Sequence, residues 1–323
     1  MKKVRIVFFG SSSHSLPTLK TIFKKKGYEI TAIVSQPDRP VGRKQILTPT
    51  PVSEFAQEHK IPLFAPLSQK NKPWLYQNPK KLASQLSVLN PDLLISVYYG
   101  QKVSQEIINL AKFGGLNLHP SLLPKYRGAS PVKWAIYNGE KETGTTLLKI
   151  AKNFDQGEIV VQEKEKIKAT DTAETLYARL FQKAAKLLIK TIPDYINGKI
   201  KLTKQDNSQA SYYPRLIREH GFIKTKDLQQ ALEGKSIKIA RQIERQIRAF
   251  HPWPSTYSLV SFYDRSKKLN RQRIPQQAKR LKILKAHLEK GKLVLDLVQL
   301  EGKKPVSFKQ FQKAYPNFQF PTH

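Results

Sequence analysis

The sequence predicts an α/β fold whose larger, N-terminal part is a doubly wound, mostly parallel sheet. Short and almost wholly apolar runs alternate with helical segments, as expected for strands that are buried on both faces. The apolar runs cover residues 4–10, 28–35, 92–99 and 115–120, with helical segments at 17–26 and 104–111. This repeated strand-helix-strand order is typical of parallel strands joined by crossover helices.

The rest of the chain predicts a smaller β-barrel domain. After a long helical segment that begins near Asp171, residues 204–222 are polar and contain the turn-forming run NSQAS, so they are interpreted as a linker. One helical segment at 227–248 then precedes three β-rich runs, at 256–263, 281–288 and 292–300. We therefore predict a first domain over residues 1–203 and a second over residues 223–323.

The composition is that of a globular protein without cysteine chemistry. The chain has 323 residues, of which 39% are hydrophobic and none is cysteine. This excludes a disulfide framework, a thiolate nucleophile and a cysteine-based zinc site, and no metal is expected. The first apolar run stops at Gly10, which is too short for a membrane span, and no signal-peptide cleavage pattern follows it. We expect a cytoplasmic protein that does not bind membranes.

The charge predicts a polyanionic partner. The 57 basic and 24 acidic residues give a net charge of +33. Residues 1–200 hold 31 basic and 15 acidic residues (+16), whereas the shorter stretch 201–323 holds 26 and 9 (+17). A polyanion should therefore bind mainly to the second part. The alternative is that the composition is rich in lysine for reasons unrelated to binding. Binding to a membrane surface is not expected, because the sequence contains no amphipathic helix with an aromatic apolar face.

A candidate reactive site lies at the end of a predicted buried strand, within GLNLHPSLLPKYRGASP (115–131). His119 ends the strand, where open α/β sheets place their ligands, and Asn117 lies two residues earlier on the same face. An amide and an imidazole together can stabilise a carbonyl oxygen that gains charge. Asp155 follows a later strand and could orient the imidazole. Spacing alone leaves open that His119 is satisfied within the fold and that Asp155 is a turn residue.

The same stretch resembles the signature of the folate-dependent formyltransferases. The pattern Asn-x-His-x-Ser-Leu-Leu-Pro-x-x-Arg-Gly-x-x-Pro is met by Asn117, His119, Ser121, Leu122, Leu123, Pro124, Arg127, Gly128 and Pro131. The resemblance implies a Rossmann-like catalytic domain that uses 10-formyltetrahydrofolate and no metal. It implies that Asn117, His119 and Asp155 are catalytic. It also places tetrahydrofolate at the turn of Ser121, Leu122, Leu123 and Pro124.

Three further stretches are similar to the branch of this family that acts on methionyl-tRNA. Residues 35–52 resemble its loop that enters the acceptor stem, with Arg43 at the position of a tRNA-contacting arginine and Arg39 and Lys44 beside it. Residues 247–257 and 300–311 resemble landmarks of its OB-like C-terminal domain. The likeness runs from about residue 4 to about residue 314. It implies a monomeric enzyme that formylates the α-amino group of initiator methionyl-tRNA in translation initiation.

Two positions qualify this interpretation. The family usually shows Gly-Thr-Pro-x-Phe where this chain has GSSSH (10–14), so His14 replaces an aromatic residue expected near the methionyl side chain. Trp253, between two prolines in HPWP, could stack on a base, although such a run favours a rigid, buried corner. The alternatives are a formyltransferase for a sugar nucleotide or another small amine, and an RNA-binding protein without activity. Neither alternative accounts for both the charge and the complete Asn117, His119 and Asp155 set.

Overall fold

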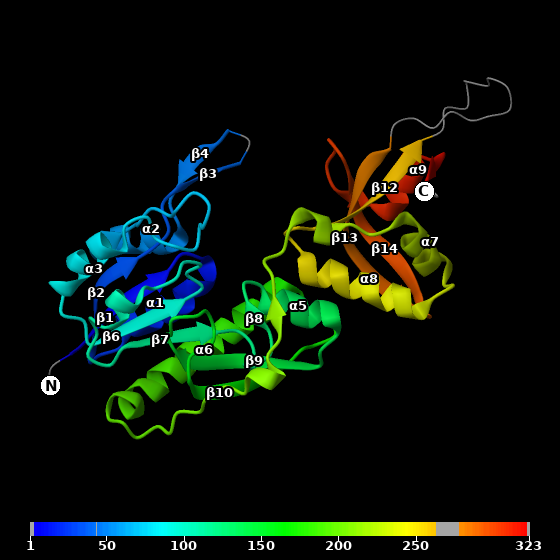
Figure 1. Ribbon diagram of the computed structural model, residues 1–323. Helices are drawn as coiled ribbons and strands as arrows, with labels where there is room; N and C mark the ends of the chain where they lie inside the picture. Colours follow the sequence, from blue (N-terminus) through cyan, green and yellow to red (C-terminus); the bar gives the residue numbers. More distant parts are fainter. Residues whose placement is uncertain (1–2, 43, 263–277, 322–323) are drawn as a thin grey trace. The chain divides into compact units, whose positions relative to one another are not determined.

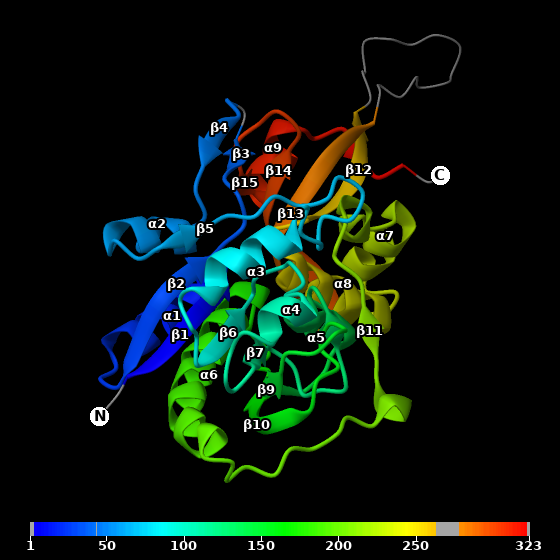
Figure 2. The ribbon, with the colours of Figure 1, turned by 60° about the vertical axis from the view of Figure 1, so that its left-hand side comes forward.

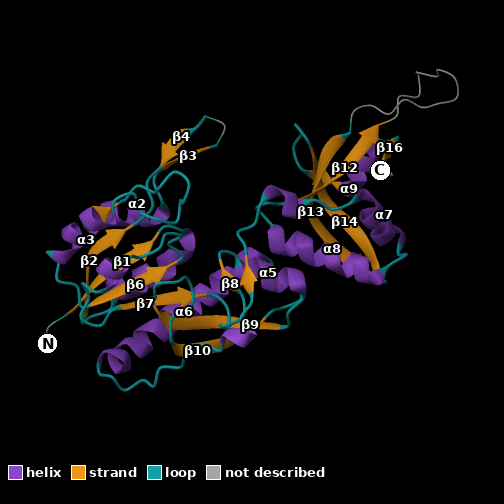
Figure 3. Ribbon diagram, viewed as in Figure 1, coloured by secondary structure: helices purple, strands orange, loops and turns teal. Residues whose placement is uncertain are grey.

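The computed structural model describes residues 3–42, 44–262 and 278–321, and the chain divides into two compact units. Unit 1 comprises Met1–Pro131, Glu142–Lys166 and Leu176–Tyr213. Unit 2 comprises Val132–Lys141, Ile167–Thr175 and Pro214–His323, so it is assembled from three pieces of the chain. Figure 3 shows an α/β first unit and a second unit rich in antiparallel strands. None of the helices in the described ranges is long and apolar enough to cross a membrane.

Unit 1 is built on a seven-stranded sheet in the order β10-β9-β7-β6-β1-β2-β5 (Figure 1). The five neighbouring strands β7, β6, β1, β2 and β5 are parallel to one another. Strand β9 is antiparallel to β7, and β10 is antiparallel to β9. The predicted mostly parallel sheet is therefore confirmed. Its strands are β1 (Val4–Gly10), β2 (Tyr28–Val34), β5 (Leu63–Phe64), β6 (Leu93–Val97), β7 (Gly115–His119), β9 (Glu142–Lys149) and β10 (Ile159–Lys166).

Helices cover both faces of this sheet (Figure 1 and Figure 2). On one face, Val7 and Phe9 of β1 pack with Leu82, Leu86 and Ile107 from α3 and α4. His14, in the 3-10 turn that precedes α1, contacts two aromatic rings of α6. The helices are α1 (Leu16–Lys24), α2 (Pro51–Glu58), α3 (Pro79–Ser87), α4 (Gln105–Ile108) and α6 (Ala173–Ile196), with short 3-10 turns η1 (Ser13–Ser15) and η2 (Asn207–Gln209).

Two small strand pairs complete unit 1. The hairpin of β3 (Arg39–Val41) and β4 (Ile46–Thr48) extends beyond the sheet in both Figure 1 and Figure 2. Strand β8 (Arg127–Gly128) pairs in parallel with β11 (Tyr212–Tyr213). This second pair joins the motif at 117–131 to the polar segment after residue 203, which therefore packs against the sheet unit.

Unit 2 is built on a five-stranded antiparallel sheet in the order β15-β14-β13-β12-β16, curled into a half-barrel. The predicted small β-barrel is confirmed in this form. Its elements are α5 (Pro131–Asn138), η3 (Arg218–Gly221), α7 (Thr225–Glu233), α8 (Ile237–Phe250), β12 (Thr256–Phe262), β13 (Lys279–Glu289), β14 (Lys292–Leu300), β15 (Val306–Ser307), α9 (Phe308–Ala314) and β16 (Phe318–Gln319).

The single helix predicted at 227–248 is wrong, because two helices occupy this stretch. Helix α7 ends at Gly234, whose φ of 75° is the left-handed conformation that ends helices and that glycine adopts at little cost. Helix α8 then restarts with Ser236, whose side chain accepts a hydrogen bond from Ile239 N. Apolar periodicity continues across the break, so periodicity alone did not reveal it.

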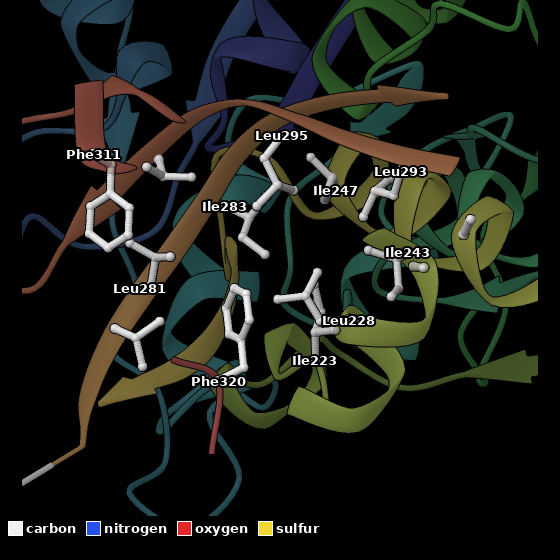
Figure 4. Close-up of a cluster of buried hydrophobic side chains, with 14 of the residues drawn as sticks. Ile223, Leu228, Ile243, Ile247, Leu281, Ile283, Leu293, Leu295, Phe311 and Phe320 are labelled. Atoms are coloured by element: carbon white, nitrogen blue, oxygen red, sulfur yellow. The ribbon is translucent and has the colours of Figure 1, made fainter. Parts of the chain in front are cut away.

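The core of unit 2 forms where α7 and α8 pack against the sheet. Figure 4 shows Ile243 and Ile247 of α8 near Leu293 and Leu295 of β14, with Ile283 of β13 beside them. Burial of each such side chain contributes about 1.5–3 kcal/mol by the hydrophobic effect. Unit 2 thus has a core of its own.

Candidate active site

The site begins at the carboxyl end of β7, which lies between the parallel strand β6 and the antiparallel strand β9. Asn117 and His119 lie two residues apart on this strand and so share one face. His119 is only 5% exposed, while Asn117 is partly exposed. Within the described ranges, no hydrogen bond engages the Asn117 side-chain amide. Its N–H donors are available to a ligand at the strand end.

Both nitrogens of the His119 imidazole face oxygen atoms of the protein. Nδ1 lies 3.3 Å from Oδ1 of Asp155, and Nε2 lies 2.8 Å from the carbonyl oxygen of Tyr126. A carbonyl oxygen accepts a hydrogen bond only from a protonated Nε2, and an ionised carboxylate is best matched by a protonated Nδ1. The doubly protonated imidazolium is the form that satisfies both contacts.

The charges of the pair support that protonation state. Burial lowers the pKa of His119, but the charge of Asp155, its hydrogen bond and the Tyr126 carbonyl outweigh burial, so the pKa is raised above its usual value. Burial conversely raises the pKa of Asp155, but His119, Gly128 N–H and Arg127 outweigh it, so the pKa is lowered. Both shifts favour the charged form of the pair, an imidazolium facing a carboxylate.

Asp155 is held on its loop by contacts to both its side chain and its backbone. Its φ of 56° is in the left-handed region, which is costly for a residue other than glycine unless the surroundings enforce it. Oδ2 accepts a hydrogen bond from Gly128 N at 2.9 Å. The Gln205 side-chain amide donates to the backbone carbonyl oxygens of Asp155 at 2.7 Å and of Gly157 at 2.8 Å. The carboxylate is thus pre-oriented toward His119.

The predicted folate-binding turn follows β7 directly, and hydrogen bonds to Thr146 and Gln162 hold its backbone. Thr146 Oγ1 accepts from Leu123 N at 3.1 Å and donates to the Ser121 carbonyl at 2.7 Å. Gln162 Nε2 donates to the Leu123 carbonyl at 2.8 Å. Ser121 and Leu123 are buried, whereas Leu122 and Pro124 are partly exposed. These contacts fix the shape of the turn and leave the Leu122 and Pro124 side chains as the parts that a ligand could touch.

His14 lies in an aromatic cluster formed with Tyr98, Tyr177 and Phe181. Its ring stacks on Tyr177 with centroids 4.7 Å apart and on Phe181 at 5.7 Å, and it meets Tyr98 edge-on at 5.2 Å. Tyr177 and Phe181 both belong to α6. His14 therefore packs as one ring of an aromatic cluster.

The basic residues predicted to contact tRNA lie on the β3–β4 hairpin. Arg39 is exposed on β3 and donates to Gln36 Oε1 at 2.5 Å, and Lys44 is exposed in the turn. Arg43 lies outside the described residues. The hairpin also exposes apolar side chains, those of Val41, Ile46 and Leu47.

Trp253 does not form the buried corner that its flanking prolines favoured. The corner is fixed by the backbone, because Ser255 N donates to the Phe250 carbonyl at 2.8 Å and Pro254 and Ser255 are buried. Trp253 itself is 48% exposed. Lys133 Nζ donates to the Trp253 carbonyl at 2.6 Å and lies 5.9 Å from the ring centroid.

A cavity of about 430 Å³ lies in unit 1. Tyr76, Leu75, Pro79 and Val103 give it apolar walls, and Lys102 and Lys152 add two cations. Lys152 precedes Asp155 by three residues on the same loop. No group of three or more His, Cys, Asp or Glu side chains placed to hold a metal occurs in the described part of the chain.

Sequence reasoning missed two contributors to the site, Arg127 and Gln205. The sequence gives Arg127 no role beyond its match to the family motif, and Gln205 lies in the segment predicted to be a linker. Their contacts span 78 residues of sequence, so no local pattern could join them. A buried arginine needs polar partners, but only the structure shows that Arg127 is buried.

Comparison with known proteins identifies the family to which this chain is similar. Residues 3–192 match the formyl transferase family. A methionyl-tRNA formyltransferase of Methylacidiphilum infernorum is 35% identical over 96% of this chain and 95% of its own, and one of Bacillus velezensis is 37% identical over 80% and 75%. The structure of a methionyl-tRNA formyltransferase from Clostridium thermocellum has a TM-score of 0.51 over 92% of this chain and 98% of that one. It is 17% identical, so that likeness is one of fold.

Proposed function

The chain belongs to the methionyl-tRNA formyltransferase family, and we propose that it transfers the formyl group of 10-formyltetrahydrofolate to the α-amino group of initiator methionyl-tRNA. The observation that carries the proposal is the buried His119–Asp155 pair beside the available amide of Asn117. A pair of this kind suits a reaction in which a proton moves and a carbonyl oxygen gains charge.

The chemistry assigns a task to each of these residues. The neutral amine forms a C–N bond to the formyl carbon, the bond from that carbon to the folate nitrogen breaks, and one proton moves from the amine to the folate nitrogen. Asn117 donates to the oxygen that becomes negative. His119 supplies positive charge beside it, and Asp155 holds the imidazolium and receives or relays the proton. Loss of one such donor typically costs about 10²–10³ in rate.

The folate is proposed to use the cavity near the Asp155 loop together with the predicted turn at residues 121–124. Folate combines flat aromatic rings with carboxylates. The apolar walls fit the rings, and Lys102 and Lys152 fit the carboxylates. The partly exposed Leu122 and Pro124 would border the same ligand. The assignment of Ser121, Leu122, Leu123 and Pro124 stays a prediction.

For tRNA we propose that one part of the chain positions the acceptor end and another binds the phosphate backbone through its charge. The β3–β4 hairpin with Arg39, Arg43 and Lys44 would meet the acceptor end, and His14 would border the methionyl side chain. The dense positive charge after residue 200 would hold the phosphate backbone. The predicted domain boundaries, 1–203 for catalysis and 223–323 for tRNA, stay a prediction, as do a monomeric state and a cytoplasmic location.

One assay tests the proposed function. The chain is incubated with 10-formyltetrahydrofolate labelled in the formyl group and with initiator methionyl-tRNA, elongator methionyl-tRNA or an amino sugar nucleotide. We expect label only on the tRNA esters, and more on the initiator. Label on the sugar nucleotide alone would establish the alternative small-amine activity. Tight tRNA binding without any transfer would instead establish a binding protein.

A further inference from the structure

Arg127 is a buried cation bound by neutral oxygen atoms. Its side chain belongs to β8, and the residue is 1% exposed. Gln205 Oε1 accepts from Nε at 3.1 Å and from Nη2 at 2.7 Å, Asn207 Oδ1 accepts from Nη2 at 2.9 Å, and Tyr212 OH accepts from Nη1 at 2.5 Å. Among the described residues, no carboxylate forms an ion pair with it. A charge buried in this way is costly unless it contributes something that a neutral residue cannot.

The charges near Arg127 are those of the proposed site. Arg127 acts electrostatically on both His119 and Asp155, lowering the pKa of each. With His119 protonated, two positive charges and one negative charge are buried together, so this group carries a net charge of +1. A buried surplus of positive charge favours a bound species that becomes negative, as the formyl oxygen does during transfer.

The contacts of Arg127 also reach the backbone of Asp155 through one side chain. Because the Gln205 carbonyl faces the guanidinium, its NH₂ group must face the other way. There it donates to the backbone carbonyls of Asp155 and Gly157. The residue after Arg127, Gly128, donates its N–H to the Asp155 carboxylate at 2.9 Å. Arg127, through Gln205, and Gly128 thus contact the backbone and the carboxylate of Asp155 respectively.

We propose that Arg127 is a positioning residue for formyl transfer, which acts through Gln205 to hold the Asp155 loop so that the carboxylate stays against His119. The proposal rests on the proposed function for its effect on rate, but not for its effect on the geometry of the pair. Arg127 itself touches no reacting atom in this account. Its planar guanidinium donates from Nε, Nη1 and Nη2 at once to Gln205, Asn207 and Tyr212, a spread of donors that the single nitrogen of a lysine could not reproduce.

The test uses the full chain with Gln205→Leu, Arg127→Lys and the matched control Asn207→Ala. Gln205→Leu breaks the relay, and Arg127→Lys keeps the charge but removes the planar guanidinium. Asn207→Ala removes one hydrogen bond from the same guanidinium without touching the Asp155 loop. Two readouts are taken: the titration of the His119 imidazole by NMR, and kcat against KM.

With Gln205→Leu and Arg127→Lys we expect His119 to lose its proton at lower pH than in the wild type, because the carboxylate is no longer held against it. We expect kcat to fall about 10- to 100-fold with KM changed less than threefold. With Asn207→Ala the titration should match the wild type. A wild-type titration in Gln205→Leu, or equal effects of Asn207→Ala and Gln205→Leu, would overturn the proposal. Because the titration needs no substrate, a shifted titration in a chain that transfers no formyl group would refute the proposed function alone.

Discussion

Replacing Asp155 by asparagine tests the buried pair without changing the shape of the site. The asparagine oxygen can still accept from Gly128 N, and its NH₂ group then faces Nδ1 of His119. That contact requires an unprotonated Nδ1, with the remaining proton on Nε2 for the Tyr126 carbonyl. The variant therefore converts an imidazolium into a neutral imidazole in place, and the pKa of His119 should fall, because burial remains while the carboxylate is gone.

The size of the effect follows from the separation of the charges. At 3.3 Å, two unit charges attract each other by about 5 kcal/mol at an effective dielectric constant of 20. Positioned acid–base groups contribute about 10²–10⁴ in rate, which corresponds to about 3–5 kcal/mol of the barrier. We expect kcat to fall by that factor. Stability should fall less than the Coulomb figure suggests, because His119 can release its proton rather than stay charged and unpaired.

The assay is single-turnover formyl transfer at pH 7.5, with NMR titration of His119 alongside. The matched control is Asp296→Asn, which removes the partner of His287 from an exposed pair 2.9 Å apart in unit 2. The control should transfer formyl at the wild-type rate. A kcat within threefold of wild type in Asp155→Asn, with His119 shown to be neutral, would refute the role assigned to the pair.

Three further outcomes are expected. Gly128→Ala should lower the free energy of unfolding in urea by about 2–3 kcal/mol, because φ is 110° and the new Cβ would lie 2.3 Å from a backbone carbonyl oxygen. The control Gly302→Ala, at φ 76° with open space around it, should lower it by only about 1 kcal/mol. Equal losses in the two variants would contradict the reasoning. Trp253→Ala should raise KM for tRNA about 10-fold at unchanged kcat, since a base stacked on an aromatic ring is worth about 1–3 kcal/mol; an unchanged KM would remove the indole from the interface. The raised pKa of His119 means that its share of stability is present at low pH and lost as pH rises through that pKa, whereas the lowered pKa of Asp155 means that its share is lost as pH falls. Unfolding of His119→Gln and wild type across pH should therefore differ most between those limits, and a difference that is flat with pH would contradict the ion pair.

Local patterns predicted the parts of the fold that local chemistry determines. The strand of residues 115–119 followed from its apolar run, and the shared face of Asn117 and His119 followed from the two-residue period of a strand. The break at Gly234 was missed because the apolar spacing of α7 and α8 continues through it. Periodicity reports which face is buried, but it does not report where the backbone turns.

The polar segment after residue 203 shows the limit of such reasoning. Its Gln, Asn and Tyr side chains are typical of a solvated linker, yet Gln205, Asn207 and Tyr212 enclose the buried guanidinium of Arg127. Polarity predicts exposure only when no buried charge needs partners. The partner lay about 80 residues earlier, and only the folded topology brings the two together.

The three-piece construction of unit 2 has a consequence for how related enzymes can be recombined. Helix α5 is bonded to the later part of that unit, since Trp134 Nε1 donates to the Pro214 carbonyl and Gln242 Nε2 to the Tyr137 carbonyl. A chimera that exchanges only the chain after residue 213 would join one parent's α5 to the other parent's α8. Functional hybrids should therefore be obtained when residues 132–141 and 167–175 travel with the C-terminal segment. Two pieces of that unit, residues 132–141 and 167–175, are also synthesised well before the segment that starts at residue 214. They can therefore pack into unit 2 only when synthesis is nearly finished.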